Sequence, residues 1–177
     1  MRKLLLLLLL AGPAAFAQEN KPKEETKHKS DPNAPYTKYK ELPAFEAIYM
    51  NGKDTFNTFN IPAGKPSLII YFSPDCDHCK KMLDEMLPQF DKLKNVNVYM
   101  MTFMPPIALQ VFNRGYHLEN YEAIKFIGQD FKFFFPTYYG VSSVPDIVLY
   151  DKRKKFVKLW PDVATMDEIL AEVKKVD

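Results

Sequence analysis

Cysteine is scarce in this sequence: its 177 residues include only Cys76 and Cys79, which are separated by two residues. Two thiols cannot supply the four protein ligands of a structural zinc site. A disulfide between them would close a nearly minimal loop, and because stabilisation grows with loop length it would add little to the fold. An isolated C-x-x-C pair therefore points to redox chemistry.

Long apolar runs are also missing, apart from the leucines at residues 4–10. That run follows a short basic start and leads to Ala15-Phe16-Ala17, a small-residue pattern typical of a signal-peptidase site. We therefore predict a cleavable signal peptide at residues 1–17 and export to an oxidising compartment. No other stretch reaches the roughly 18 apolar residues that a membrane span needs, so we expect no stable membrane insertion after cleavage.

The sequence has no marked excess of charge of either sign. The formal net charge of +2 equals the charge of Arg2 and Lys3 in the predicted leader, so the mature chain balances to zero. This balance disfavours a nucleic-acid-binding protein. Residues 18–35 are rich in Lys, Glu and Pro and poor in large apolar side chains, which predicts a disordered linker. A single domain is then expected over residues 36–177.

Apolar periodicity predicts alternating strands and helices in that domain. Strands are expected at residues 42–50, 55–60, 67–72, 96–103, 146–150 and 155–160. Helices are expected from residue 80 to about 94 and at residues 107–114, 118–127 and 165–175, whereas residues 131–140 are ambiguous. Such an order predicts an α/β sandwich with a mixed central sheet.

Three segments carry a resemblance to a known fold. Residues 67–81 (SLIIYFSPDCDHCKK) resemble the active-site strand, turn and helix of thioredoxins, and Val144-Pro145 resembles their cis-proline loop. The hairpin expected at Asn51-Gly52 resembles the N-terminal hairpin of the TlpA/ResA branch, which is secreted in bacteria. The resemblance implies a thioredoxin-like three-layer sandwich with that hairpin and an inserted helical segment at residues 107–127. It also implies a periplasmic or secreted thiol–disulfide oxidoreductase.

The spacing of the two cysteines suits this chemistry. If the helix begins at the motif, Cys76 lies at its N-terminus, where unpaired backbone N–H groups and the helix dipole stabilise a thiolate. Cys79 then lies almost one turn deeper and can attack a mixed disulfide at Cys76. We therefore predict that Cys76 attacks and that Cys79 resolves.

Neighbouring residues are expected to tune the redox potential. A cationic His78 would stabilise the Cys76 thiolate and make the couple more oxidising. Asp75 and Asp77 flank Cys76, and their carboxylates would oppose a thiolate. We expect the potential to be intermediate or oxidising, because solvent screens exposed carboxylates more than a helix terminus.

The resemblance implies two further features of the site. A cis Val144–Pro145 bond would hold a backbone edge beside the cysteines, where an extended substrate could pair with Val144. Many thioredoxins carry a buried acid six residues before the first cysteine, and this chain has Ile70 there. The residue that accepts a proton is therefore left unassigned.

The sequence is compatible with two other functions. A copper-binding chaperone resembling the Sco proteins would share the scaffold and would need a distant histidine, for which His117 is the candidate. A thiol peroxidase would need a Thr/Ser-rich loop that the segment Ser73-Pro74-Asp75-Cys76 lacks. The favoured hypothesis has no metal and no cofactor. Its partners would be protein thiols or disulfides and a membrane or periplasmic redox protein.

Overall fold

A seven-stranded mixed sheet forms the centre of the molecule in the computed structural model, which describes residues 30–176. The strand order is β2-β1-β5-β4-β3-β6-β7. The strands are β1 (Glu46–Tyr49), β2 (Thr55–Asn57), β3 (Ser67–Tyr71), β4 (Asn97–Thr102), β5 (Ile124–Gln129), β6 (Asp146–Tyr150) and β7 (Phe156–Pro161). The central strands β3, β4 and β5 are parallel, and all other pairs are antiparallel.

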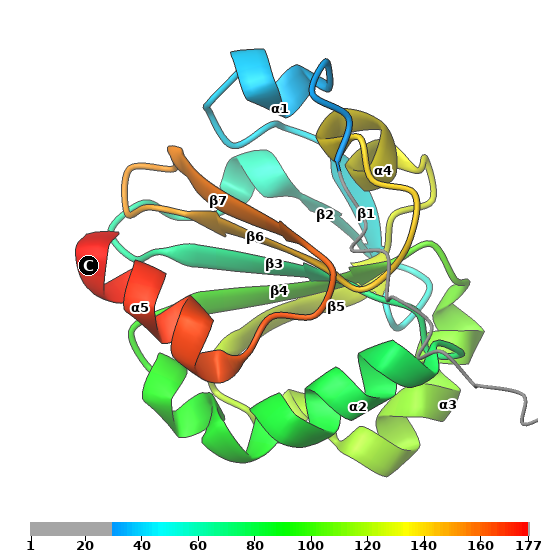
Figure 1. Cartoon of the computed structure of the whole chain (residues 1–177). Coiled ribbons are helices and arrows are strands. Elements are labelled where there is room, and N and C mark those ends of the chain that lie inside the picture. Colours follow the sequence, from blue (N-terminus) through cyan, green and yellow to red (C-terminus); the bar gives the residue numbers. More distant parts are fainter. Residues whose placement is uncertain (1–29, 177) are drawn as a thin grey trace, which may run out of the picture.

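Helices cover both faces of this sheet (Figure 1). The α-helices are α1 (Pro35–Lys38), α2 (Asp77–Met86), α3 (Pro106–Tyr116), α4 (Phe134–Tyr139) and α5 (Met166–Val176). Short 3-10 helices are η1 (Thr58–Asn60), η2 (Leu87–Leu93) and η3 (Leu118–Asn120). Helices α2, α3 and α5 lie on one face, and α1 and α4 lie on the other.

The two faces of the sheet have different cores. Strand β3 is buried along its whole length, as expected for a strand covered on both sides. Leu68 and Ile70 of this strand belong to the core beneath α2, α3 and α5, which is built mainly of aliphatic side chains and methionines. Ile69 and Tyr71 belong to the opposite core beneath α4, where aromatic side chains predominate. The predicted three-layer α/β sandwich is confirmed.

Several local predictions are confirmed as well. The N-terminal hairpin joins β1 and β2 in antiparallel register. At the start of α5, the Thr165 backbone N–H donates to Glu168 Oε2 at 2.8 Å, and the Glu168 N–H donates to Thr165 Oγ1 at 3.3 Å. This reciprocal pair is a capping box, and it marks the start of the helix that the sequence predicts at residues 165–175. The helix expected from residue 80 to about 94 differs in its second half: it is α-helical only to Met86 and gives way to the 3-10 helix η2 at Leu87, beside Pro88, whose ring cannot continue an α-helix.

The expectation of a helix over residues 118–127 is wrong. Only η3 is helical there, and the chain then forms β5, which pairs with both β4 and β1. Gly128 is part of this strand, where a Cβ would lie 2.2 Å from the Ile48 carbonyl oxygen. The inserted segment at residues 107–127 is therefore helical mainly in its first half. Spacing misled here because a buried strand and a short helix carry similar apolar runs.

The two ends of the chain need separate comment. The predicted signal peptide and residues 18–29 of the predicted linker lie outside the described residues. Residues 30–35 pack against α4: the Asp31 N–H donates to the Gly140 carbonyl at 2.8 Å, and Ala34 is buried. Packing contacts therefore begin before Tyr36, where the domain was expected to start.

Candidate active site

The cysteine motif lies at the C-terminal ends of the parallel strands. Because β3, β4 and β5 run in the same direction, their C-terminal ends lie side by side where α2 begins, at the right of Figure 1. The loop after β3 turns through Ser73, whose carbonyl accepts the Cys76 N–H at 3.1 Å. In open α/β sheets, ligands and functional groups are commonly found at the carboxyl ends of the strands.

Cys76 is the N-cap residue of α2. Its extended backbone (φ −89°, ψ 117°) lets the side chain turn back over the first helical turn, where Sγ accepts the Cys79 backbone N–H at 3.2 Å. This bond offers to sulfur one of the N–H groups that a helix N-terminus leaves unpaired. Cys76 is half-buried, so that a substrate can reach it.

Cys79 differs from Cys76 in exposure. It lies on the first turn of α2 and is fully buried in the core beneath that helix. Burial raises the pKa of the Cys79 thiol well above its ordinary value, and the hydrogen bond with Cys76 adds to the rise. A backbone hydrogen bond from Ser73 acts in the opposite direction. Cys79 therefore needs help to lose its proton.

The Val144–Pro145 segment lies against the motif. The peptide bond between these residues is cis. The Cys76 thiol donates to the Val144 carbonyl oxygen at 3.5 Å, although the two residues are 68 positions apart. Pro145 is buried and Val144 is half-buried. The structure thus brings together four of the residues that the sequence singled out: Cys76, Cys79, Val144 and Pro145.

The three expected tuning residues, Asp75, Asp77 and His78, are all exposed. The Asp77 side chain is 92% exposed, and its carboxylate forms an ion pair with Lys80 at 3.3 Å. Solvent and this neighbouring ammonium group both weaken its field at Cys76. Asp77 therefore opposes a Cys76 thiolate less than its position in the sequence suggests.

Asp146 is a functional candidate that the sequence reasoning placed only as the first residue of a strand. It follows Pro145 directly and is fully buried. Neither carboxyl oxygen has a hydrogen-bond partner. Burial, together with the nearby Asp162, raises the pKa of Asp146 to about 8. A charged residue opening the otherwise apolar strand DIVLY was the signal that could have identified it.

The copper-chaperone alternative would need a histidine near the two cysteines. Within residues 30–176, no three His, Cys, Asp or Glu side chains gather as a ligand set. His117, the candidate copper ligand, caps the C-terminal end of α3. Because α3 connects the parallel strands β4 and β5, its C-terminal end lies near the N-terminal end of β5, at the opposite end of the strands from the cysteines.

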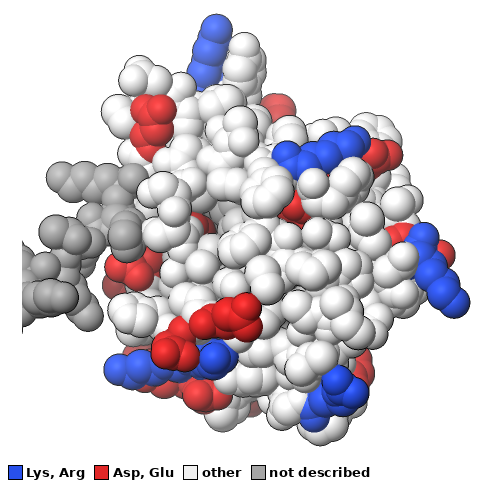
Figure 2. Space-filling model, turned by 90° about the vertical axis from the view of Figure 1, so that its right-hand side faces the viewer, with Lys and Arg blue, Asp and Glu red and all other residues white. Residues whose placement is uncertain are grey.

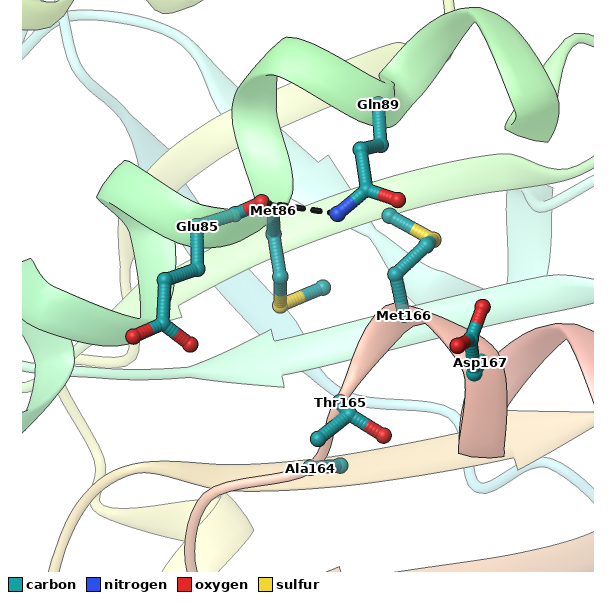
Figure 3. Close-up of a pocket in the computed structure, with 7 residues that line it drawn as sticks. All are labelled: Glu85, Met86, Gln89, Ala164, Thr165, Met166 and Asp167. Atoms are coloured by element: carbon teal, nitrogen blue, oxygen red, sulfur yellow. Dashed lines mark hydrogen bonds between the residues drawn. The ribbon is translucent and has the colours of Figure 1, made fainter.

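A separate hollow of about 100 Å³ lies between the end of α2 and the start of α5 (Figure 3). Met86 and Met166 line it, and Gln89 Nε2 donates to the Glu85 carbonyl oxygen beside it at 3.0 Å. Since Cys76 lies at the opposite end of α2, this hollow does not belong to the cysteine site.

Fold and site together define a protein of the thioredoxin class, with a C-x-x-C pair at a helix N-terminus facing an X–Pro segment. The sequence model of the thioredoxin-like domain matches residues 60–177, and the chain belongs to this family. The expected family is thereby confirmed.

Solved structures share the fold at low sequence identity. A putative thioredoxin from Neisseria meningitidis is 20% identical, with 77% of this chain and 89% of that chain covered and a TM-score of 0.62. A secreted disulfide oxidoreductase of Mycobacterium tuberculosis, homologous to E. coli DsbE, is 21% identical, with 74% and 95% covered and a TM-score of 0.59. A thiol peroxidase from Chromobacterium violaceum is 19% identical, with 84% and 90% covered and a TM-score of 0.62. No curated protein sequence matches the chain.

Proposed function

We propose that this protein is a thiol–disulfide oxidoreductase that exchanges disulfides with exported protein substrates through Cys76 and Cys79. One observation carries the proposal: Cys76 Sγ accepts the Cys79 N–H at a helix N-terminus and also lies 3.5 Å from the Val144 carbonyl oxygen. A reactive sulfur and a backbone edge that can hold an extended substrate are thus adjacent.

The first step in the reducing direction is attack by Cys76. Its thiolate attacks one sulfur of a substrate disulfide, and a bond forms between Cys76 Sγ and that sulfur. The substrate S–S bond breaks, and the second substrate sulfur leaves as a thiolate. The N–H groups at the start of α2 favour the Cys76 thiolate that this step consumes.

The second step is resolution by Cys79. Its sulfur attacks Cys76 Sγ, the Cys76–Cys79 disulfide forms, and the bond to the substrate breaks, so that the substrate leaves with two thiols. Run backwards, the same steps transfer the disulfide to a substrate. Two factors set the direction of exchange: the reduction potential of the pair, and the membrane or periplasmic redox partner that reduces or oxidises it again.

The surface around the site suits protein substrates. Figure 2 views the molecule from the side at which α2 begins, and its charged side chains leave a broad uncharged area between them. Exposed apolar residues follow the C-terminal ends of β4 and β5, namely Ile107, Phe131 and Phe133. Phe133 also has a left-handed backbone (φ 52°), which is unusual for an aromatic residue. Contact of such a surface with an apolar stretch of polypeptide is favourable.

The proposed location is the periplasm or the extracellular space. The N-terminal pattern predicts export, and residues 30–176 contain no helix both long and apolar enough to cross a membrane. Protein disulfides form and persist in these compartments, so a thiol–disulfide oxidoreductase would find its substrates there.

Reduction of insulin disulfides, followed as turbidity with dithiothreitol as electron donor, tests the proposal. The mature protein should accelerate precipitation. The Cys76→Ser variant should be inactive, and Cys79→Ser should be trapped as a mixed disulfide with insulin. Absence of acceleration by the wild type, combined with peroxide consumption or Cu(I) binding that needs both cysteines, would contradict the proposal and favour a peroxidase or a copper chaperone.

A further inference from the structure

Val144 lies in a loop, residues 140–145, that joins the end of α4 to the start of β6. Within the described part of the chain, residues 142 and 143 make no hydrogen bond. The loop is fixed instead at its two ends, where Gly140 ends α4 and the buried Pro145 precedes β6. The position of the Val144 backbone, with which an extended substrate would pair, therefore depends on how Gly140 is held.

A segment near the N-terminus contacts Gly140. This segment, the N-terminal arm, comprises residues 30–38 and ends in the short helix α1. The Asp31 N–H donates to the Gly140 carbonyl oxygen at 2.8 Å. A Cβ on Gly140 would lie 2.6 Å from Ala34 Cβ and 2.7 Å from Asp31 Cβ, so the close contact requires glycine. A helix end alone would also accept asparagine at such a position.

The N-terminal arm has a defined shape where it meets Gly140. The Asp31 side chain accepts the Asn33 N–H at 2.8 Å, and the Asp31 carbonyl accepts the Ala34 N–H at 3.1 Å. Ala34 is buried, whereas the residues on either side of it are exposed. Figure 1 shows α1 beside α4, above the sheet. The family model matches only residues 60–177, so the arm lies outside the matched region.

The arm also supports the fold, but its contact with Gly140 adds little to that support. Tyr36 covers apolar surface, because its ring centre lies 5.8 Å from that of Tyr139 and 5.2 Å from that of Phe156. Gly140 has no side chain, so its contact with the arm buries little apolar area. What this contact fixes is the place of a backbone carbonyl at the start of the loop.

We propose that the N-terminal arm positions Val144 for pairing with a polypeptide substrate, with Asp31 and Ala34 as the positioning residues. This inference rests on the proposed function and concerns how its substrates are held. Val144 follows Gly140 by four positions, and its carbonyl oxygen lies 3.5 Å from Cys76 Sγ. A loop that is already ordered loses less conformational freedom when substrate binds, so affinity is higher. The arm acts on binding and not on the sulfur chemistry.

Single-turnover reactions of the reduced mature protein with two disulfides separate binding from chemistry. The first is a peptide with one internal disulfide and several residues on each side of it. The second is 2-hydroxyethyl disulfide, which has no peptide backbone to pair with Val144. The rate measured against peptide concentration gives a half-saturating concentration, which reports binding, and a limiting rate, which reports chemistry.

The variant Ala34→Leu introduces a side chain for which there is no room beside Gly140. We expect the half-saturating peptide concentration to rise about tenfold, as the weakening of one or two backbone hydrogen bonds would give. The limiting rate, and the rate with 2-hydroxyethyl disulfide, should stay unchanged. Asn33→Leu is the matched control, because it places the same side chain at the neighbouring exposed position, and it should behave like wild type.

Gly140→Ala disturbs the same contact from the loop side and should show the same selective effect. If both variants kept the wild-type half-saturating concentration, the inference would be overturned and the proposed function would stand. Equal slowing with both disulfides would indicate general damage to the site and would overturn it as well. If wild-type protein reacted with neither disulfide, the proposed function itself would fail.

Amide hydrogen exchange checks the displacement of the loop directly. In Ala34→Leu, the amides of residues 140–145 should exchange faster than in wild type, while those of β4 should not change, because the loop alone loses an anchor. Faster exchange in the loop combined with an unchanged half-saturating concentration would contradict the inference, since the arm would then order the loop without affecting substrate binding.

Discussion

Two buried carboxyl groups, those of Asp130 and Asp146, lie at the C-terminal ends of the parallel strands and differ in their surroundings. Asp130 follows β5, and both of its oxygens accept backbone N–H groups at the start of α4. Asp146 begins β6, and neither of its oxygens has a partner. Burial raises the pKa of both groups, and hydrogen bonds oppose the rise only at Asp130. Two equally buried carboxyl groups therefore differ in protonation because their hydrogen bonds differ.

The largest expected effect concerns the stability of Asp146→Asn at alkaline pH. The pKa of Asp146 is about 8 in the folded protein and near 3.9 in the unfolded chain, so the folded state favours the protonated form. That contribution is fully present below pH 4 and is lost as the pH rises through 8. Wild-type protein should lose roughly 3–5 kcal/mol of unfolding free energy between pH 5 and 9 from this group. The variant should not show this loss.

Urea unfolding of both proteins across this pH range measures the effect. Near pH 5 the two unfolding free energies should be similar, and at pH 9 the variant should be the more stable. Parallel curves for the two proteins would mean that Asp146 is not buried as a neutral acid.

The second prediction concerns Asp130→Ala, which should cost about 2–3 kcal/mol because two backbone N–H groups are left unpaired at the start of α4. Denaturant unfolding at pH 6 gives this value. Unchanged stability would mean that these two hydrogen bonds do not hold the start of α4 in place.

A smaller effect is expected for Asp162→Asn. The charge of Asp162 raises the pKa of Asp146, so its removal should lower that pKa, by less than about one unit for a single partly solvated charge. The pH at which the alkaline loss of stability levels off should fall by the same amount, as urea unfolding measures. A rise of this pH would exclude Asp162 as a charge acting on Asp146.

The smallest effect is expected for Asp77→Asn. Asp77 is next to Cys76 in sequence, but its side chain is 92% exposed and paired with Lys80. Its removal should change the reduction potential by less than about 20 mV, because exposed ion pairs contribute little. Equilibration of wild type and variant in one glutathione buffer measures the difference. A shift clearly larger than this would mean that the exposed charges beside Cys76 do influence the pair.

Much of the fold could be predicted because its signals are local. The apolar run of β3, the C-x-x-C pair and the Thr165–Glu168 capping box each occupy a few consecutive residues. Strand β5 could not be recognised in this way, because its identity depends on β1 and β4 on either side. Gly128 shows the same limit, since only the approach of the Ile48 carbonyl explains why a glycine is needed.

The same distinction between local signals and distant contacts applies to the candidate site. Both cysteines and the Val144-Pro145 segment follow from motifs, and the structure places Cys76 against Val144. The raised pKa of Asp146 depends on burial, on the absence of hydrogen bonds and on the charge of Asp162, which lies in a different strand connection. None of these properties can be read from the order of residues alone.

The reduction potential of the Cys76–Cys79 pair tests the central claim most directly. Mature protein is equilibrated in glutathione buffers of graded composition, and the fraction oxidised is measured by thiol alkylation. We predict a reversible two-electron transition with a potential between the roughly −270 mV of thioredoxin and the roughly −120 mV of a strong oxidant. A pair that does not form its disulfide reversibly at any buffer composition would contradict the account.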